Sequence, residues 1–249
     1  MADYSKFLER HARTERFGSF SEEDLQRWSK DLPAEVIDFL RAEGHASFSD
    51  GFLETVRPDD HREELAAWRL PHAKSHVFMK TAFGSYIYYR KPNYYYLEPF
   101  MGLNGNMTDQ FNLVFNLYLV MDAFMVDGFF QSRYARDKAS LPPLGPDEMY
   151  GLVPPLKKGG SPDGSSIDVV KARDHHAMLA KLAGAKRSRF EESARRHRAF
   201  DDGARHPPRS RTFSQPASRV SFDRRAGDTH GLGVFSSRKR PPVVCVLTT

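Results

Sequence analysis

The strongest constraint on the fold of this chain lies in residues 144–182, where two tight turns and two consecutive prolines precede an amphipathic helix. Proline fixes φ and has no backbone N–H, so the double proline is stiff and donates no backbone hydrogen bond. Such a segment adopts a single conformation when the rest of a domain packs on it. The turns are at Gly145-Pro146 and Gly159-Gly160-Ser161-Pro162, and the prolines are Pro154 and Pro155.

Charge is distributed unevenly along the 249 residues, although the formal net charge is +5. Residues 186–249 carry about 15 basic and 6 acidic side chains, roughly +9, whereas residues 1–185 carry about 22 and 26, roughly −4. The body is therefore acidic and only the tail is basic. A nucleic-acid function inferred from the overall charge would apply to the tail alone.

The cellular location of the protein is indicated by its cysteine content and by its apolar segments. The single cysteine, Cys245, excludes an intrachain disulfide and gives no sign of an oxidising compartment. The charged N-terminus has no apolar core of a signal peptide. Residues 111–130 are the longest apolar stretch, but Asp122 and Asp127 within it favour buried helices over a membrane span. We expect a cytoplasmic protein.

The pattern of apolar residues predicts an α+β fold in which helices surround a small antiparallel β-meander. Helices are expected over residues 3–16, 21–28, 33–44, 58–68, 108–120 and 128–138. Extended segments are expected over residues 48–56, with a turn at Asp50-Gly51, and over residues 76–83, 86–90 and 94–97. A capping box at Ser165 and Asp168 predicts the start of the last helix.

The tail, residues 186–249, loses all apolar periodicity and is rich in arginine, serine and proline. This composition predicts disorder. Two interpretations remain open for it, a genuine basic arm or the translation of an unselected reading frame produced by a frameshift or a gene-model artefact.

The chain resembles type VI secretion immunity proteins, which combine a GAD-like (GAD-related) N-terminal domain with a C-terminal module that carries an Asp-Glu-Met-Tyr-Gly motif. The C-terminal resemblance comes from residues 144–151, Val153-Pro154, Gly159-Gly160-Ser161, Val170-Lys171-Ala172 and His175. The N-terminal resemblance comes from Leu32-Pro33, Val36, Phe39, Leu40, Gly44, Phe52, Val56, Pro58, Trp68, His76-Val77-Phe78 and Thr81-Ala82-Phe83-Gly84. The family favours leucine after the helix histidine, where this chain has His176.

The resemblance implies three segments: a GAD-like domain in residues 1–100, a helical C-terminal immunity module in residues 101–185, and the tail in residues 186–249. It also implies a cytoplasmic immunity protein that binds and blocks a toxin, which in known relatives is a DNase. The signature residues are expected to be structural. They are Gly145, Met149, Gly151, Pro154, Gly159, Gly160 and His175.

Asp147 and Glu148 are the first candidates for a working site. Adjacent residues do not face each other on a helix or strand, so this pair alone makes a poor acid–base couple. Three roles remain open, which are capping of a helix N-terminus, contact with a basic toxin surface, and catalysis. We expect partner contact to involve this pair together with Tyr150.

Histidines and tyrosines supply the other candidates. Helical spacing puts His175 on the apolar face of the last helix and His176 toward solvent, so the two do not chelate one ion. Alternation places Tyr86 and Tyr88 on one face of the meander, where exposed rings would suit a protein partner. Core packing is the alternative for these tyrosines.

The resemblance therefore implies an immunity protein that neutralises a cognate toxin, a basic nuclease delivered by type VI secretion, by stoichiometric inhibition. We expect no enzymatic turnover, no cofactor, no metal site and no membrane association. Two alternatives remain: an enzyme built around Asp147, Glu148 and His175, and a nucleic-acid-binding protein that uses the basic tail.

Overall fold

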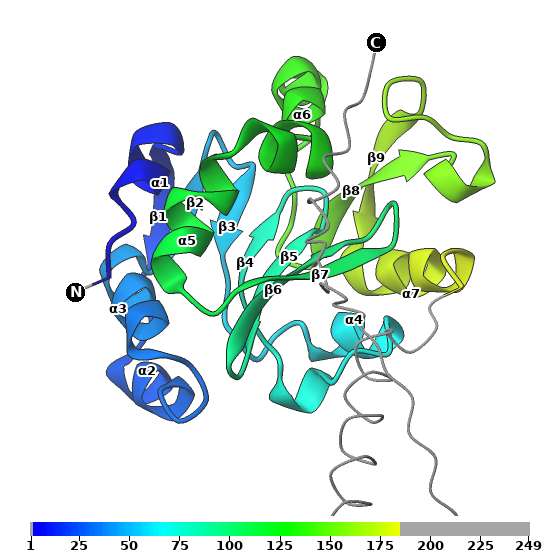
Figure 1. Ribbon diagram of the computed structural model, residues 1–249. Helices are drawn as coiled ribbons and strands as arrows, with labels where there is room; N and C mark the ends of the chain where they lie inside the picture. Colours follow the sequence, from blue (N-terminus) through cyan, green and yellow to red (C-terminus); the bar gives the residue numbers. More distant parts are fainter. Residues whose placement is uncertain (1, 185–249) are drawn as a thin grey trace, which may run out of the picture. The chain divides into compact units, whose positions relative to one another are not determined.

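The computed structural model describes residues 2–184, and the predictions made for residues 186–249 fall outside this part of the chain. The described residues form an α+β fold with one seven-stranded and one two-stranded antiparallel sheet (Figure 1). The strands are β1 (Arg13–Gly18), β2 (His45–Phe48), β3 (Leu53–Thr55), β4 (His76–Thr81), β5 (Tyr86–Arg90), β6 (Asn93–Glu98), β7 (Leu103–Thr108), β8 (Glu148–Val153) and β9 (Ser166–Lys171).

Helices precede, interrupt and follow the large sheet. The α-helices are α1 (Ser5–Arg10), α2 (Glu22–Trp28), α3 (Ala34–Glu43), α4 (Arg62–Ala67), α5 (Phe111–Asn116), α6 (Gln131–Asp137) and α7 (Ala172–Leu182). Short 3-10 helices are η1 (His72–Lys74), η2 (Tyr118–Val120), η4 (Lys138–Ser140) and η5 (Leu156–Lys158), and η3 (Ala123–Gly128) is a π-helix.

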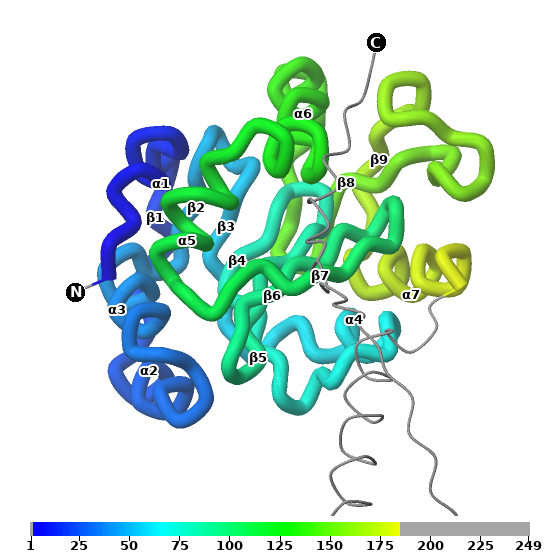
Figure 2. Tube along the Cα trace, viewed as in Figure 1, coloured from blue at the N-terminus to red at the C-terminus, as the bar shows by residue number. Residues whose placement is uncertain are grey.

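The large sheet is a meander in which every strand pairs with the next one along the chain, in the order β1 to β7 (Figure 2). The predicted meander is therefore confirmed, and it is larger than expected. The predicted turn at Asp50-Gly51 connects β2 to β3, and Ser49, Asp50 and Gly51 all have positive φ there. Strand β7 follows the predicted domain boundary at residue 100 and pairs along its length with β6.

One face of the sheet is covered by α1, α3 and α5 through a cluster of phenylalanines (Figure 1). Phe7 packs edge-on against Phe48 with ring centroids 5.2 Å apart, and Phe115 lies 4.5 Å from Phe39. Phe78 on β4 stacks on Phe115 at 6.2 Å. These rings are all fully buried, so this face forms a large part of the hydrophobic core.

The opposite face carries a row of directly paired residues that crosses four strands. Strand register places Glu54 opposite Lys80, Lys80 opposite Tyr86, and Tyr86 opposite Leu97. Helices α4 and α7 cover the Tyr86 end of the row, where the Tyr86 ring stacks on His176 at 4.8 Å. The Glu54 and Lys80 end lies beside the segment that leads into β8.

Residues 145–153 are held by backbone hydrogen bonds to the end of β4 and to the start of α7. The Tyr150 N–H donates to the Ala82 carbonyl oxygen at 2.9 Å, and the Ala172 N–H donates to the Asp147 carbonyl oxygen at 2.9 Å. Residues 101–184, where a helical module was expected, contain α5, α6 and α7 together with β7 and the β8–β9 hairpin. The helix start predicted at Ser165 and Asp168 is wrong, since residues 166–171 form β9 and α7 begins at Ala172.

The helix predicted over residues 3–16 is also shorter than expected. It ends at Arg10, and residues 13–18 instead form β1, an edge strand paired with β2. Pairing with β2 outweighs the local helical pattern, because β-structure depends on tertiary partners that a short window of sequence does not contain. Among the described residues, no helix is both long and apolar enough to cross a membrane.

Candidate binding cleft

A cleft of about 760 Å³ opens between the sheet and the segment that precedes β8. Its walls come from the end of β1 and the following loop, from β2 to β5, from the start of α4, and from residues 144–149. Carboxylates outnumber basic groups along these walls, with Glu54, Asp60, Glu64, Asp147 and Glu148 against Arg57 and Lys80. A smaller cleft of about 380 Å³ continues from it and shares Glu54, Lys80 and Glu148.

An ion-pair network forms one part of the floor. Glu54 accepts a hydrogen bond from His45 Nε2 at 2.7 Å and lies 3.3 Å from Lys80 Nζ. Lys80 also donates to the Pro146 carbonyl oxygen at 3.2 Å, which ties the sheet to the segment before β8. Burial opposes ionisation of Glu54, but these partners outweigh it and lower the pKa of the carboxyl group.

Histidines and aromatic rings form the other part of the floor. The Tyr86 ring is sandwiched between His61 and His176, each with its centroid 4.8 Å away. Trp68 Nε1 donates to His176 Nδ1 at 2.9 Å, so the remaining hydrogen of neutral His176 is on Nε2. That Nε2 atom has no hydrogen-bond partner within residues 2–184 and lies behind Gly84, a residue of the cleft wall.

Glu64 lies beside this stack and is 7% exposed. It accepts a hydrogen bond from His61 Nδ1 at 3.4 Å, which links two residues three positions apart at the start of α4. Burial would raise the pKa of Glu64, but the hydrogen bond and charge of His61 outweigh it and lower that pKa. Glu64 is therefore a carboxylate at neutral pH, even though it is buried.

Three of the sequence-predicted partner-binding residues, Asp147, Glu148 and Tyr86, line this cleft. Asp147 is exposed, whereas Glu148 accepts hydrogen bonds from the Gly145 N–H at 2.8 Å and Lys171 Nζ at 3.0 Å. The Gly145 hydrogen bond holds the pKa of Glu148 below its usual value. The pair does not cap a helix, as one interpretation of the sequence had it, because Glu148 is the first residue of strand β8.

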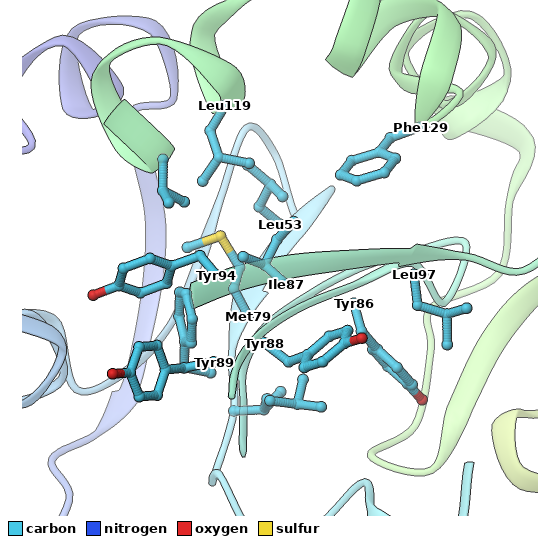
Figure 3. Close-up of a cluster of buried hydrophobic side chains, with 14 of the residues drawn as sticks. Leu53, Met79, Tyr86, Ile87, Tyr88, Tyr89, Tyr94, Leu97, Leu119 and Phe129 are labelled. Atoms are coloured by element: carbon cyan, nitrogen blue, oxygen red, sulfur yellow. The ribbon is translucent and has the colours of Figure 1, made fainter. Parts of the chain in front are cut away.

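The predicted tyrosines are buried, so their rings belong to the core instead of an exposed surface (Figure 3). Tyr86 is 1% and Tyr88 0% exposed, and the Tyr88 hydroxyl group is paired with the Asn104 side chain. Tyr150 is 5% exposed, and its hydroxyl group donates to the Pro142 carbonyl oxygen. Burial of each hydroxyl group raises the pKa of Tyr86 and Tyr88 well above the usual value.

The signature residues hold the β8–β9 hairpin and its loop in place. A Cβ atom on Gly160 would lie 2.0 Å from the Pro154 carbonyl oxygen, and one on Gly151 would lie 2.9 Å from the His175 ring. The Gly145 N–H donates to Glu148, Met149 is buried against Gly84, and Gly159 has a φ of +86°. His175 is buried and faces Gly151 and Phe100, away from the residues that line the cleft.

His176 does not face solvent, and the prediction that it would is wrong. It is 0% exposed because α7 is enclosed on two sides, by β8 next to His175 and by α4 and Tyr86 next to His176. The helical pattern predicted one apolar face, whereas this helix has two buried faces. The leucine expected at this position could not accept the Trp68 hydrogen bond.

The floor residues of the cleft were not predicted from the sequence. They are His45, Glu54, His61, Glu64 and Lys80. The spacing of His61 and Glu64 by three positions near a predicted helix start was a usable signal. No local signal connects Glu54 with Lys80, because strand register alone brings them together.

Residues 2–95 match the GAD-like domain family. The chain therefore contains a GAD-like domain, as the sequence resemblance implied. A crystal structure of Atu4351 from Agrobacterium tumefaciens has a similar fold, with a TM-score of 0.53 at 15% identity, covering 72% of this chain and 89% of that one. No curated protein gives a significant sequence match.

Proposed function

We propose that this protein is an immunity protein that binds a cognate toxin and neutralises it by stoichiometric inhibition. The observation that carries the proposal is the open acidic cleft, which residues of the GAD-like domain and residues 144–149 build together. A cleft lined by five carboxylates and two basic side chains suits a basic partner. The predicted partner, a nuclease delivered by type VI secretion, has the matching charge because nucleases bind phosphates.

Inhibition in this proposal is occlusion of the active site or nucleic-acid groove of the toxin, without turnover. The net charge of about −4 on residues 1–185 would speed the encounter with a basic protein by long-range attraction. Association should therefore be fast at low salt and slower as ionic strength rises.

The proposal is tested by coexpression with the toxin encoded next to this gene. We expect growth to be restored and a stable complex to be recovered at a fixed ratio of the two chains. Continued killing while this protein remains soluble and abundant would disprove the proposal for that partner.

A further inference from the structure

Among residues 2–184, the side chain that pairs with the Glu64 carboxylate at the floor of the cleft is His61, whose Nδ1 atom lies 3.4 Å away and whose ring is a cation only when protonated. The two basic residues of the cleft are already engaged, since Lys80 pairs with Glu54 at 3.3 Å and Arg57 with Asp24 at 3.0 Å. A buried carboxylate is costly unless a permanently charged group pairs with it, so a further cation beside Glu64 would stabilise it.

Two further carboxylates stand at the exposed edge of the same cleft. Asp60 approaches Arg57 only to 4.0 Å, and Asp147 makes no ion pair within the part of the chain that is described. Glu54 and Glu148, by contrast, are each within 3.3 Å of a lysine. Glu64, Asp60 and Asp147 together therefore give the cleft an uncompensated negative potential, which attracts cations.

The walls also suit a long basic side chain. Apolar side chains of Phe20, Val56 and Leu144 line the cleft and can pack against methylene groups. At the floor, the rings of His61 and Tyr86 lie beside Glu64. A guanidinium group matches this setting better than an ammonium group, because it is less strongly hydrated and both stacks on rings and bridges carboxylates.

We propose that the cleft receives an arginine side chain of the protein partner, with its guanidinium group bound to Glu64 and guided in by Asp60 and Asp147. This inference rests on the proposed function, because it assigns the contact through which the toxin is held. The cavity of about 760 Å³ exceeds one side chain, so the loop that carries the arginine enters as well.

The first experiment titrates full-length protein with a blocked Ala-Arg-Ala peptide and follows binding by NMR. The control peptide replaces arginine with citrulline, which has the same shape and no charge. We expect the arginine peptide to bind at least about tenfold more tightly, and Glu64→Gln to remove most of this preference. Asp147→Asn, an exposed change that leaves packing intact, should weaken binding several-fold, whereas the exposed Asp168→Asn on β9 should have no effect.

Equal binding or no binding of the two peptides by folded protein would overturn the proposal. Equal or tighter binding of Ala-Lys-Ala would overturn the choice of arginine. If Glu64→Gln lowers stability, peptide binding by the Asp147→Asn variant tests the proposal instead, because the Asp147 side chain contributes nothing to the core.

The second experiment measures toxin affinity for the same variants and separates this inference from the proposed function. We expect Glu64→Gln and Asp147→Asn to raise the dissociation constant of the complex by about tenfold and several-fold respectively. A toxin that binds the wild-type and variant proteins equally would refute the cleft assignment and leave the immunity function intact. Binding of the arginine peptide without binding of any toxin would refute the immunity function instead.

Discussion

His176 is a residue whose ionisation the fold changes strongly. It is completely buried against Tyr86 and Trp68, and this burial lowers its pKa to about 3. The unfolded chain binds a proton on this ring near the ordinary histidine pKa of about 6.5. Between these two values the unfolded state holds more protons than the folded state, so stability falls as pH falls from about 6.5 toward 3.

We expect the free energy of unfolding to decrease by about 1.4 kcal/mol per pH unit for this proton over that window. His176→Gln keeps an acceptor for Trp68 Nε1 and should reduce the slope by about one proton, at some cost in overall stability. Urea unfolding from pH 7.5 to 4.5 measures the slope, and His72→Gln, at an exposed residue, is the matched control. An unchanged slope in His176→Gln would show that the ring is not held neutral.

Gly160 is a second residue for which the structure predicts a large effect. Its missing side chain leaves room for the Pro154 carbonyl oxygen, which a Cβ atom would approach to 2.0 Å. Gly160→Ala should therefore destabilise the protein by about 2–4 kcal/mol, since backbone atoms have to move. Gly18→Ala is the control, because a Cβ atom at Gly18 would meet nothing within 4 Å, and this variant should unfold like the wild type in thermal or urea melts.

At the scale of secondary-structure elements, strand register brings together the residues of the cleft floor. It places Glu54 on β3 opposite Lys80 on β4, and Lys80 is almost buried. Lys80→Met should destabilise the protein by about 1–3 kcal/mol because it leaves the Glu54 carboxylate with a weaker set of partners. Asp122→Asn breaks the exposed pair with Arg10 and should cost less than about 1 kcal/mol.

A double-mutant cycle isolates the pairing energy. Glu54→Gln combined with Lys80→Met should be more stable than the sum of the two single changes predicts, since neither charge is left alone. Strict additivity in urea unfolding would mean that the pair contributes no coupling across β3 and β4.

At the scale of the whole molecule, the sequence allows two functions that different parts of the chain would carry. The basic tail would bind DNA, and the acidic body would neutralise the toxin. Residues 186–249 carry about 15 basic side chains, so full-length protein should show weak, strongly salt-dependent DNA binding. Truncation after Ala185 should abolish this binding and leave toxin neutralisation intact. Gel-shift assays and the coexpression test measure the two properties on the same pair of proteins. Loss of neutralisation on truncation would assign the tail a role in immunity.

Much of the fold was readable from local sequence. The tyrosine-rich strands, the Asp50-Gly51 turn, the capping box at Ser21 and the α+β class all follow from short patterns, and the Ser21 side chain does accept a hydrogen bond from the Asp24 N–H. The match of residues 2–95 to the GAD-like family agrees with the N-terminal resemblance. The immunity role, the domain boundaries and the partner-contact residues stay predictions.

Residues 144–182 show where sequence stops and tertiary structure takes over. The glycines and prolines of this stretch indicated its turns from sequence, because proline restricts φ and glycine permits the positive φ that tight turns require. Only the folded chain decided that Glu148–Val153 and Ser166–Lys171 pair as strands, that α7 is buried on two sides, and that Asp147 stands at the edge of a cleft whose floor holds Glu64. Strand pairing and burial depend on residues distant in sequence, and these contacts form only when the whole sheet assembles.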